Sequence, residues 1–120
     1  MATTRPLGSD EKAEGPRWGF TDEQLATLPH SFRDDLFAGK VCLISGGGSG
    51  LGRAMAYFFV RLGAKVMICG RRQEKLEETA GGIRRWLGRD VETMSMTIRD
   101  PEQVATLMAR TVERLGGLHL

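Results

Sequence analysis

Residues 45–52, with the sequence Ser-Gly-Gly-Gly-Ser-Gly-Leu-Gly, constrain the fold of this chain more than any other stretch. They follow the apolar run Val41–Ile44 and precede apolar residues at helical spacing, so they join a buried strand to an amphipathic helix. Glycine permits a tight turn and lets the backbone approach a ligand closely. A helix that begins near Leu51 points its free amides at phosphate groups. This order predicts a dinucleotide-binding loop, and a Walker-type loop is excluded because no Gly-Lys-Ser/Thr follows.

The rest of the chain alternates between short apolar runs and helical patterns. Two further strands are expected at Val66–Cys69 and Val91–Ile98, each followed by a helix. Asp100-Pro101 is a strong start signal for the last helix. Its apolar face is expected to consist of Val104, Leu107, Met108, Thr111, Val112 and Leu115. Three strand–helix units in a row predict an α/β fold with a Rossmann-type parallel sheet and flanking helices, truncated after the third unit.

The chain is expected to divide into an arm at residues 1–38 and an incomplete dinucleotide-binding half-domain at residues 39–120. Residues 1–20 combine glycine, proline and charges without periodicity, which predicts a mobile arm. Thr21 and Gln24 form a capping box that starts a short helix over Asp22–Leu28. Phe32, Leu36 and Phe37 are expected to pack on the surface of the half-domain.

Composition limits the partners that a chain of this kind can have. Apolar residues make up 41% and charged residues 27%, and the formal net charge is +2, so nucleic-acid binding is not expected. No apolar stretch is long enough to span a membrane, and isolated His30 and His119 predict no metal site. Cys42 and Cys69 lie in apolar runs and are expected to be buried thiols of a reducing, cytoplasmic protein.

The spacing of the glycine loop resembles that of one known family. Gly46-x-x-x-Gly50-x-Gly52, preceded by a hydroxyl residue, is similar to the Thr-Gly-x-x-x-Gly-x-Gly pattern of the short-chain dehydrogenase/reductase family, with Ser in place of Thr. The resemblance extends from Gly39 to Leu120 and implies a nicotinamide-dependent oxidoreductase. The positions that match the family's cofactor-binding motif are Ser45, Gly46, Ser49, Gly50, Leu51 and Gly52.

The residues after the second and third strands bear on which nucleotide is bound. An NAD enzyme usually has an acidic residue about 20 positions after the glycines. This chain has Gly70 followed by Arg71 and Arg72, whose guanidinium groups can bind a 2′-phosphate. NADP(H), which carries that phosphate, is therefore expected in preference to NAD(H). The alternative is that both arginines are solvated charges at a helix start. By resemblance, Thr97 and Ile98 lie beside the adenine, although Thr97 replaces the family's usual Asp.

The lead arm, the glycine loop, Gly70–Arg72 and Thr97–Asp100 together are similar to the enoyl-CoA and 2,4-dienoyl-CoA reductase branch. That likeness implies an acyl-CoA or other small-molecule substrate and a homo-oligomer at full length, and a 3-oxoacyl or sugar/steroid reductase stays open. The family's catalytic Ser, Tyr and Lys come later in its fold, so no catalytic residue is expected here. Tyr57 and Arg61 match Tyr-x-x-x-basic spacing, but a packing role is expected for Tyr57. The alternative to an enzyme is a truncated nucleotide-binding remnant without catalysis.

Overall fold

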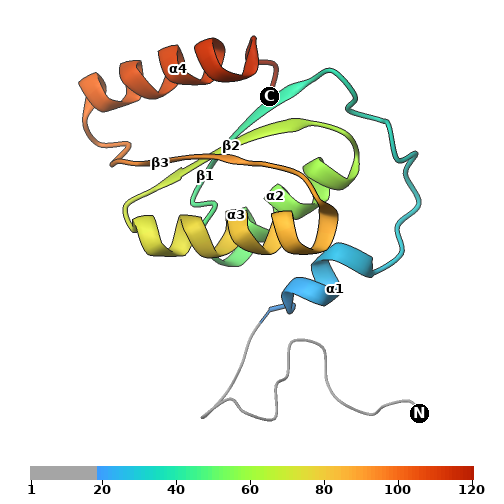
Figure 1. Cartoon of the computed structure of the whole chain (residues 1–120). Coiled ribbons are helices and arrows are strands. Elements are labelled where there is room, and N and C mark those ends of the chain that lie inside the picture. The colour runs from blue at the N-terminus through green and yellow to red at the C-terminus, as the bar shows by residue number, and fades with distance from the viewer. Residues whose placement is uncertain (1–18) are drawn as a thin grey trace, which may run out of the picture.

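The computed structural model describes residues 19–120 and shows a parallel sheet between two layers of helices (Figure 1). Residues 1–18, where most of the mobile arm is expected, lie outside the described part of the chain. In chain order the elements are α1 (Asp22–Thr27), β1 (Val41–Ser45), α2 (Gly50–Arg61), β2 (Lys65–Gly70), α3 (Gln73–Leu87), β3 (Glu92–Ser95) and α4 (Pro101–Leu115). The predicted Rossmann-type order of three strand–helix units is therefore confirmed.

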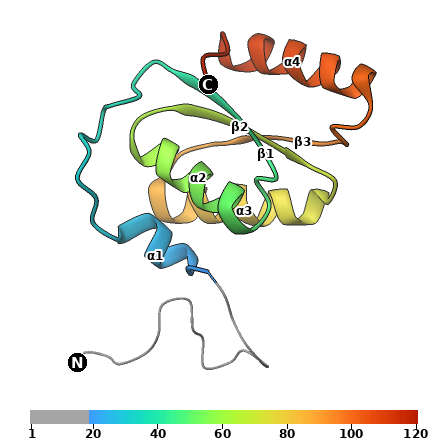
Figure 2. The ribbon, with the colours of Figure 1, turned by 180° about the vertical axis from the view of Figure 1, so that it is seen from behind.

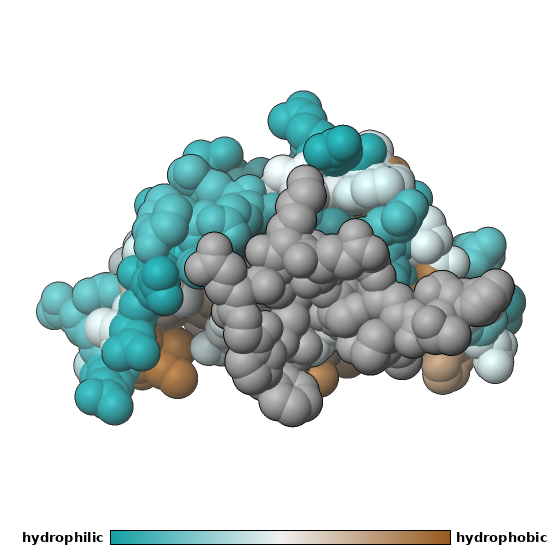
Figure 3. Space-filling view, turned by 90° about the horizontal axis from the view of Figure 1, so that it is seen from below, coloured by the Kyte–Doolittle hydropathy of each residue, from teal (hydrophilic) through white to brown (hydrophobic). Residues whose placement is uncertain are grey.

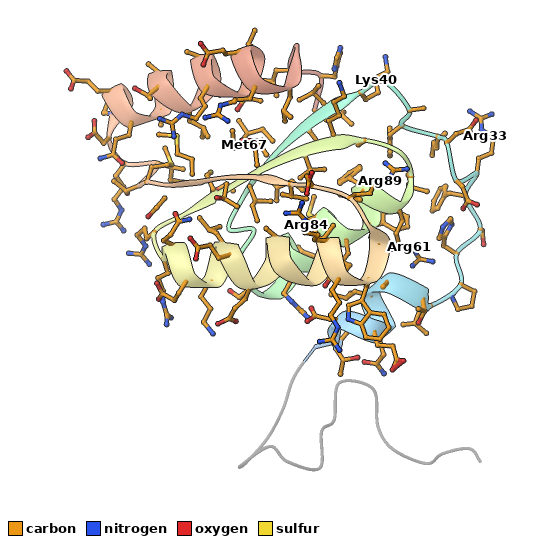
Figure 4. The ribbon with its side chains drawn as sticks, viewed as in Figure 1. Arg33, Lys40, Arg61, Met67, Arg84 and Arg89 are labelled. Atoms are coloured by element: carbon orange, nitrogen blue, oxygen red, sulfur yellow. The ribbon has the colours of Figure 1, made fainter. Side chains whose placement is uncertain are left out.

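The sheet is buried on both faces because successive residues of its strands enter two different cores. β2 lies between β1 and β3, and both pairings are parallel. Helices α2 and α3 cover one face and α4 covers the other, as Figure 2 shows from behind. Ile44 and Ile68 belong to the core beneath α2 and α3, whereas Met67 points from β2 toward α4 (Figure 4). This alternation explains why β1 and β2 are apolar except at Ser45 and Lys65, which lie at a strand end.

The third strand is shorter than the sequence suggests. It ends at Ser95, so Thr97 and Ile98 lie in the following loop instead of in the strand. Its neighbour β2 ends at Gly70, and the amide of Met96 makes the last bond to it, donating to the Gly70 carbonyl at 2.7 Å. A strand cannot continue past the end of the neighbour that satisfies its amides, whatever its apolar pattern. The two residues are consequently free to face a ligand.

Helix α4 buries a narrower stripe than its pattern indicates. Leu107 and Thr111 are buried, but Met108 is 41% exposed and Val112 is 50% exposed, so these two expected face residues are not in the core. The helix rests on the sheet along one line of side chains spaced three or four residues apart, which also includes the partly buried Val104 and Leu115. Met108 and Val112 lie one position further round the helix and miss that line.

The last residues of the chain lie along the outer edge of β1. The Leu120 amide donates to the Val41 carbonyl at 3.1 Å, and the Leu43 amide donates to the Leu120 carbonyl at 2.9 Å. These two bonds flank Cys42 in the pattern of a parallel ladder. The His119 ring also accepts a bond from the Val41 amide through Nδ1 at 2.9 Å. The outer edge of β1 is therefore paired over its first half.

Helix α1 is part of the folded unit because one of its carboxylates bonds to two side chains of α2 and lies against α3. The capping box is present: Gln24 Oε1 accepts from the Thr21 amide, and the Thr21 hydroxyl accepts from the Gln24 amide. Asp22 Oδ1 pairs with Arg53 of α2 and accepts a 2.8 Å bond from the Tyr57 hydroxyl. Tyr57 has no exposed surface and lies against Gly82 of α3. The expected packing role of Tyr57 is confirmed.

The segment between α1 and β1 packs on the domain less evenly than expected. Phe37 packs against Phe59 in a tilted arrangement with 5.1 Å between ring centroids, and its amide donates to the Leu62 carbonyl at 2.8 Å. Phe32 meets the edge of Phe58 and lies beside His30, but it stays 54% exposed, and Leu36 is also exposed. Contact is concentrated at Phe37 because the backbone is fixed to α2 at that residue.

The outer surface has the polarity that the layered arrangement requires. On the face opposite α4 most of the coloured side chains are hydrophilic (Figure 3). Both cysteines are buried and free, one on β1 and one on β2. Among residues 19–120 there is no helix long and apolar enough to cross a membrane.

Two adjacent glycines of α3 should respond oppositely to the same substitution. A Cβ at Gly81 meets nothing within 4 Å, so Gly81→Ala should raise the free energy of unfolding by about 0.5–1 kcal/mol through helix propensity. A Cβ at Gly82 would collide with the Tyr57 hydroxyl and approach Asp22, so Gly82→Ala should lower it by about 1–3 kcal/mol. Urea unfolding of both variants measures this, and equal shifts would contradict the close packing at Gly82.

Tyr57 should resist ionisation in the folded chain. Burial, and then the hydrogen bond to Asp22, raise the pKa of its phenol well above the usual value. Because the unfolded phenol ionises near pH 10 and the folded one at higher pH, the free energy of unfolding should fall as the pH rises above about 10. Tyr57 is the single tyrosine, so phenolate absorbance reports on it alone. Coincident titration of the folded and urea-unfolded chain would show that the phenol is accessible.

Candidate functional site

A cavity of about 510 Å³ lies where the carboxyl ends of the three strands meet. Such ends of an open parallel sheet are the usual place for a ligand. The wall comes from the glycine loop after β1, the start of α3 after β2 and the loop after β3. Its residues are Ser45, Gly46, Gly48, Ser49, Gly70, Arg71, Arg72, Lys75, Leu76, Met96, Thr97, Ile98 and Arg99.

The glycine loop is folded back tightly against both β2 and its own helix. Gly46 has a φ of +76°, and its amide donates to the Cys69 carbonyl at 2.8 Å, which turns the chain off the sheet. A Cβ on Gly52 would strike the Gly46 carbonyl, and a Cβ on Gly47 would strike Ile68. Glycine is therefore required at these positions for close approach of the backbone. The loop thereby places the first turn of α2 directly beside the cavity.

The start of α2 offers unsatisfied donors. The helix begins at Gly50, and the amides of its first turn have no carbonyl partner within the helix. Ser49 occupies the N-cap position, yet its side chain makes no capping hydrogen bond. Leu51 is 77% exposed in this turn. Free amides, a free hydroxyl and the positive end of the helix dipole together suit a phosphate group.

The opposite wall is basic. Arg71, Arg72 and Lys75 line the cavity there, Arg99 lines it from the loop after β3, and no carboxylate is among its lining residues. Arg72 lies 3.2 Å from Glu74, and the Glu74 backbone amide followed by the Arg72 guanidinium lowers the pKa of that carboxyl. Arg71 has no acidic partner within residues 19–120. Arg99 likewise has no acidic partner in this part of the chain, so the guanidinium groups of Arg71 and Arg99 are the two beside the cavity that no carboxylate engages.

The third wall is the loop that follows β3. Ile98 is 64% exposed, and Thr97 stands beside it at the cavity. The Thr97 hydroxyl accepts a bond from the Arg99 amide at 3.2 Å, so its own proton remains available to donate. Asp100 accepts from the Glu102 amide and caps α4, as the sequence predicts.

The structure brings the predicted residues together at one cavity, with some differences in role. Ser45, Gly46, Ser49, Arg71, Arg72, Thr97 and Ile98 all line it. Gly50, Leu51 and Gly52 do not line it but form the adjoining first turn of α2. Sequence reasoning missed Lys75 and Arg99. The position of Lys75 in the first turn of α3, shortly after Arg71-Arg72, is the signal that could have pointed to it.

Comparison with known proteins gives consistent matches. Residues 40–120 match the family model described as short chain dehydrogenase. A Caenorhabditis elegans protein named Probable 2,4-dienoyl-CoA reductase 3 is 43% identical over 84 residues, covering 70% of this chain and 27% of that protein. The Saccharomyces cerevisiae peroxisomal 2,4-dienoyl-CoA reductase is 38% identical, covering 72% of this chain and 30% of that protein. The chain thus spans less than a third of the length of these two relatives.

Solved structures agree with the fold. A citronellol catabolism dehydrogenase of Pseudomonas aeruginosa superposes with a TM-score of 0.70 at 43% identity, covering 73% of this chain and 36% of that one. A short chain dehydrogenase of Shigella flexneri, solved in complex with NADP, gives a TM-score of 0.66 at 30% identity over 72% of this chain and 37% of that one. Both matches leave most of the larger chain outside the comparison.

Substituting Gly52 should damage both the loop and ligand binding. The Cβ of Gly52→Ala would meet a backbone carbonyl, which cannot rotate away, so α2 must move off the loop. We expect the free energy of unfolding to fall by about 1–3 kcal/mol and the affinity for a nicotinamide dinucleotide, measured by calorimetry, to fall at least about tenfold. Gly81→Ala is the matched control, because the same substitution there meets open space. Unchanged affinity in Gly52→Ala would mean that the ligand does not depend on this contact.

Proposed function

The chain belongs to the short-chain dehydrogenase family, and we propose that its cavity binds NADP(H) for an oxidoreductase that acts on a conjugated acyl-CoA. The observation that carries the proposal is the composition of the cavity wall, which combines a glycine loop, four cations and no carboxylate beside a helix start. When bound, the nicotinamide supplies the hydride chemistry. The residues of this chain bind and orient the nucleotide.

The preference for NADP(H) follows from charge at the ribose end of the site. An enzyme selective for NAD(H) has a carboxylate there, which would repel a 2′-phosphate. In this chain the second strand ends in Gly70, and Arg71 follows without an acidic partner among the described residues. A hydrogen bond to a charged group contributes about 1.5–3 kcal/mol, which corresponds to about one to two decades in affinity. The NADP complex of the Shigella relative supports this direction.

The acyl-CoA substrate is proposed from the relatives. The two relatives described above are named as 2,4-dienoyl-CoA reductases. They are much longer than this chain, so the activity and a homo-oligomeric assembly are proposals for the whole protein. The compartment is likewise a proposal: the sequence predicts a cytoplasmic protein, while the yeast relative is named as peroxisomal.

A second candidate is a nucleotide-binding chain without catalysis of its own. It is favoured by the state of Tyr57, the single tyrosine, which is buried and bonded to Asp22 and so cannot donate a proton at the cavity. Oxidation of NADPH by the 120-residue chain in the presence of a 2,4-dienoyl-CoA separates the two. Turnover supports an enzyme, and binding without turnover supports the second candidate for this chain alone.

Arg71→Ala should weaken NADPH binding selectively. We expect the dissociation constant for NADPH to rise about 10–100-fold, with NADH nearly unchanged, because only the 2′-phosphate loses its guanidinium. Arg72→Ala should have a smaller effect, since Glu74 already engages that side chain. Arg89→Ala is the control, because Arg89 follows α3 at the opposite end of the sheet (Figure 4). Calorimetry with both nucleotides measures the ratio, and tighter binding of NADH by the unchanged chain would defeat the proposal.

A further inference from the structure

One backbone amide in the loop after β3 stands apart from its neighbours. The Ile98 amide has no acceptor among residues 19–120, although Ile98 lines the cavity and is largely exposed. The amides on both sides are bonded within the chain: Met96 donates to Gly70, Thr97 to the Gln103 side chain, Arg99 to the Thr97 hydroxyl and Asp100 to the Thr97 carbonyl. The loop is therefore held so that one N–H remains for a ligand.

The side chain of Gln103 makes this arrangement possible. It reaches back from the first turn of α4, and its Oε1 accepts from the Thr97 amide at 2.9 Å. Its Nε2 donates to Asp100 Oδ2, also at 2.9 Å, while the other oxygen of Asp100 caps the helix. Both ends of the Gln103 amide are thus fixed, which sets its orientation and connects the loop to the helix.

The two groups that the loop presents match the edge of an adenine ring. The Ile98 amide can donate to a ring nitrogen, and the Thr97 oxygen, which already accepts from Arg99, keeps a second lone pair for an amino group. Adenine carries an acceptor nitrogen directly beside an exocyclic amino group on its Watson–Crick edge. A shift of the loop by a fraction of an ångström would misalign both bonds.

We propose that Gln103 is a positioning residue that holds the Thr97–Ile98 backbone in register with the adenine of the bound nucleotide. This inference rests on the proposed NADP(H) site and concerns a residue that does not line the cavity. Gln103 acts only through Thr97 and Asp100. Loss of the Gln103 side chain would weaken the discrimination of the base. The contacts to the diphosphate and the 2′-phosphate would remain, because they come from other elements.

The test compares the affinity for NADPH with the affinity for its hypoxanthine analogue. In the analogue the ring nitrogen bears a proton, so it cannot accept a hydrogen bond from the Ile98 amide. We expect the unchanged chain to bind NADPH about tenfold more tightly, the value of one neutral hydrogen bond. In Gln103→Leu, which keeps the size and loses both bonds, the ratio should fall to about threefold or less. Glu102→Ala should keep the full ratio, because Glu102 lies in the same helical turn and its side chain is exposed.

The ratio of the two affinities separates positioning from a merely structural role, because a general loss of stability would weaken the binding of both nucleotides equally. A Gln103→Leu chain that keeps the tenfold ratio overturns the inference, as does an unchanged chain that binds both nucleotides equally. Failure of the unchanged chain to bind NADPH would overturn the proposed function as well.

A second measurement needs no substitution. By amide hydrogen exchange, the Thr97 amide should be protected in the free chain and the Ile98 amide should become protected only with NADPH. Protection of Ile98 before NADPH is added would contradict the inference.

Discussion

The approach of α2 to the carbonyl of Gly46 is the contact on which the rest of the site depends. It exists only because position 52 has no side chain carbon, and it brings the first turn of α2 to the mouth of the cavity. The same turn of chain is bonded to β2 through the Cys69 carbonyl. Strand, loop and helix therefore form one rigid corner, and the free amides of the helix acquire a fixed direction before any ligand arrives.

The sheet and its flanking helices could be predicted because burial of a strand on two faces produces a continuous apolar run in the sequence. Short runs such as Val41–Ile44 and Val66–Cys69 are apolar at every position, since odd and even residues enter different cores. Helix starts at Thr21 and Asp100 were readable because capping is a local interaction within a few residues. Features that depend on neighbours close in sequence were accordingly found with nearly correct bounds.

Features set by distant parts of the chain were missed or misjudged. The length of β3 is limited by where β2 ends, and the exposure of Val112 depends on the line along which α4 rests on the sheet. Lys75 joins the cavity wall through the turn of α3, and Gln103 shapes the loop after β3 without lining the cavity at all. The motif residues of the site were therefore predictable, whereas the residues that support or supplement them required the folded arrangement.

The junction of Asp22 with Arg53 and Tyr57 changes where the domain should be considered to begin. The sequence pattern suggests a boundary near Gly39, yet the phenol that fills the space between α2 and α3 has its hydrogen-bond acceptor on α1. A shortened protein beginning at the first strand would lack the acceptor of that hydroxyl and the counter-charge of Arg53. The physical unit thus includes α1, and a shortened protein intended to fold should retain it.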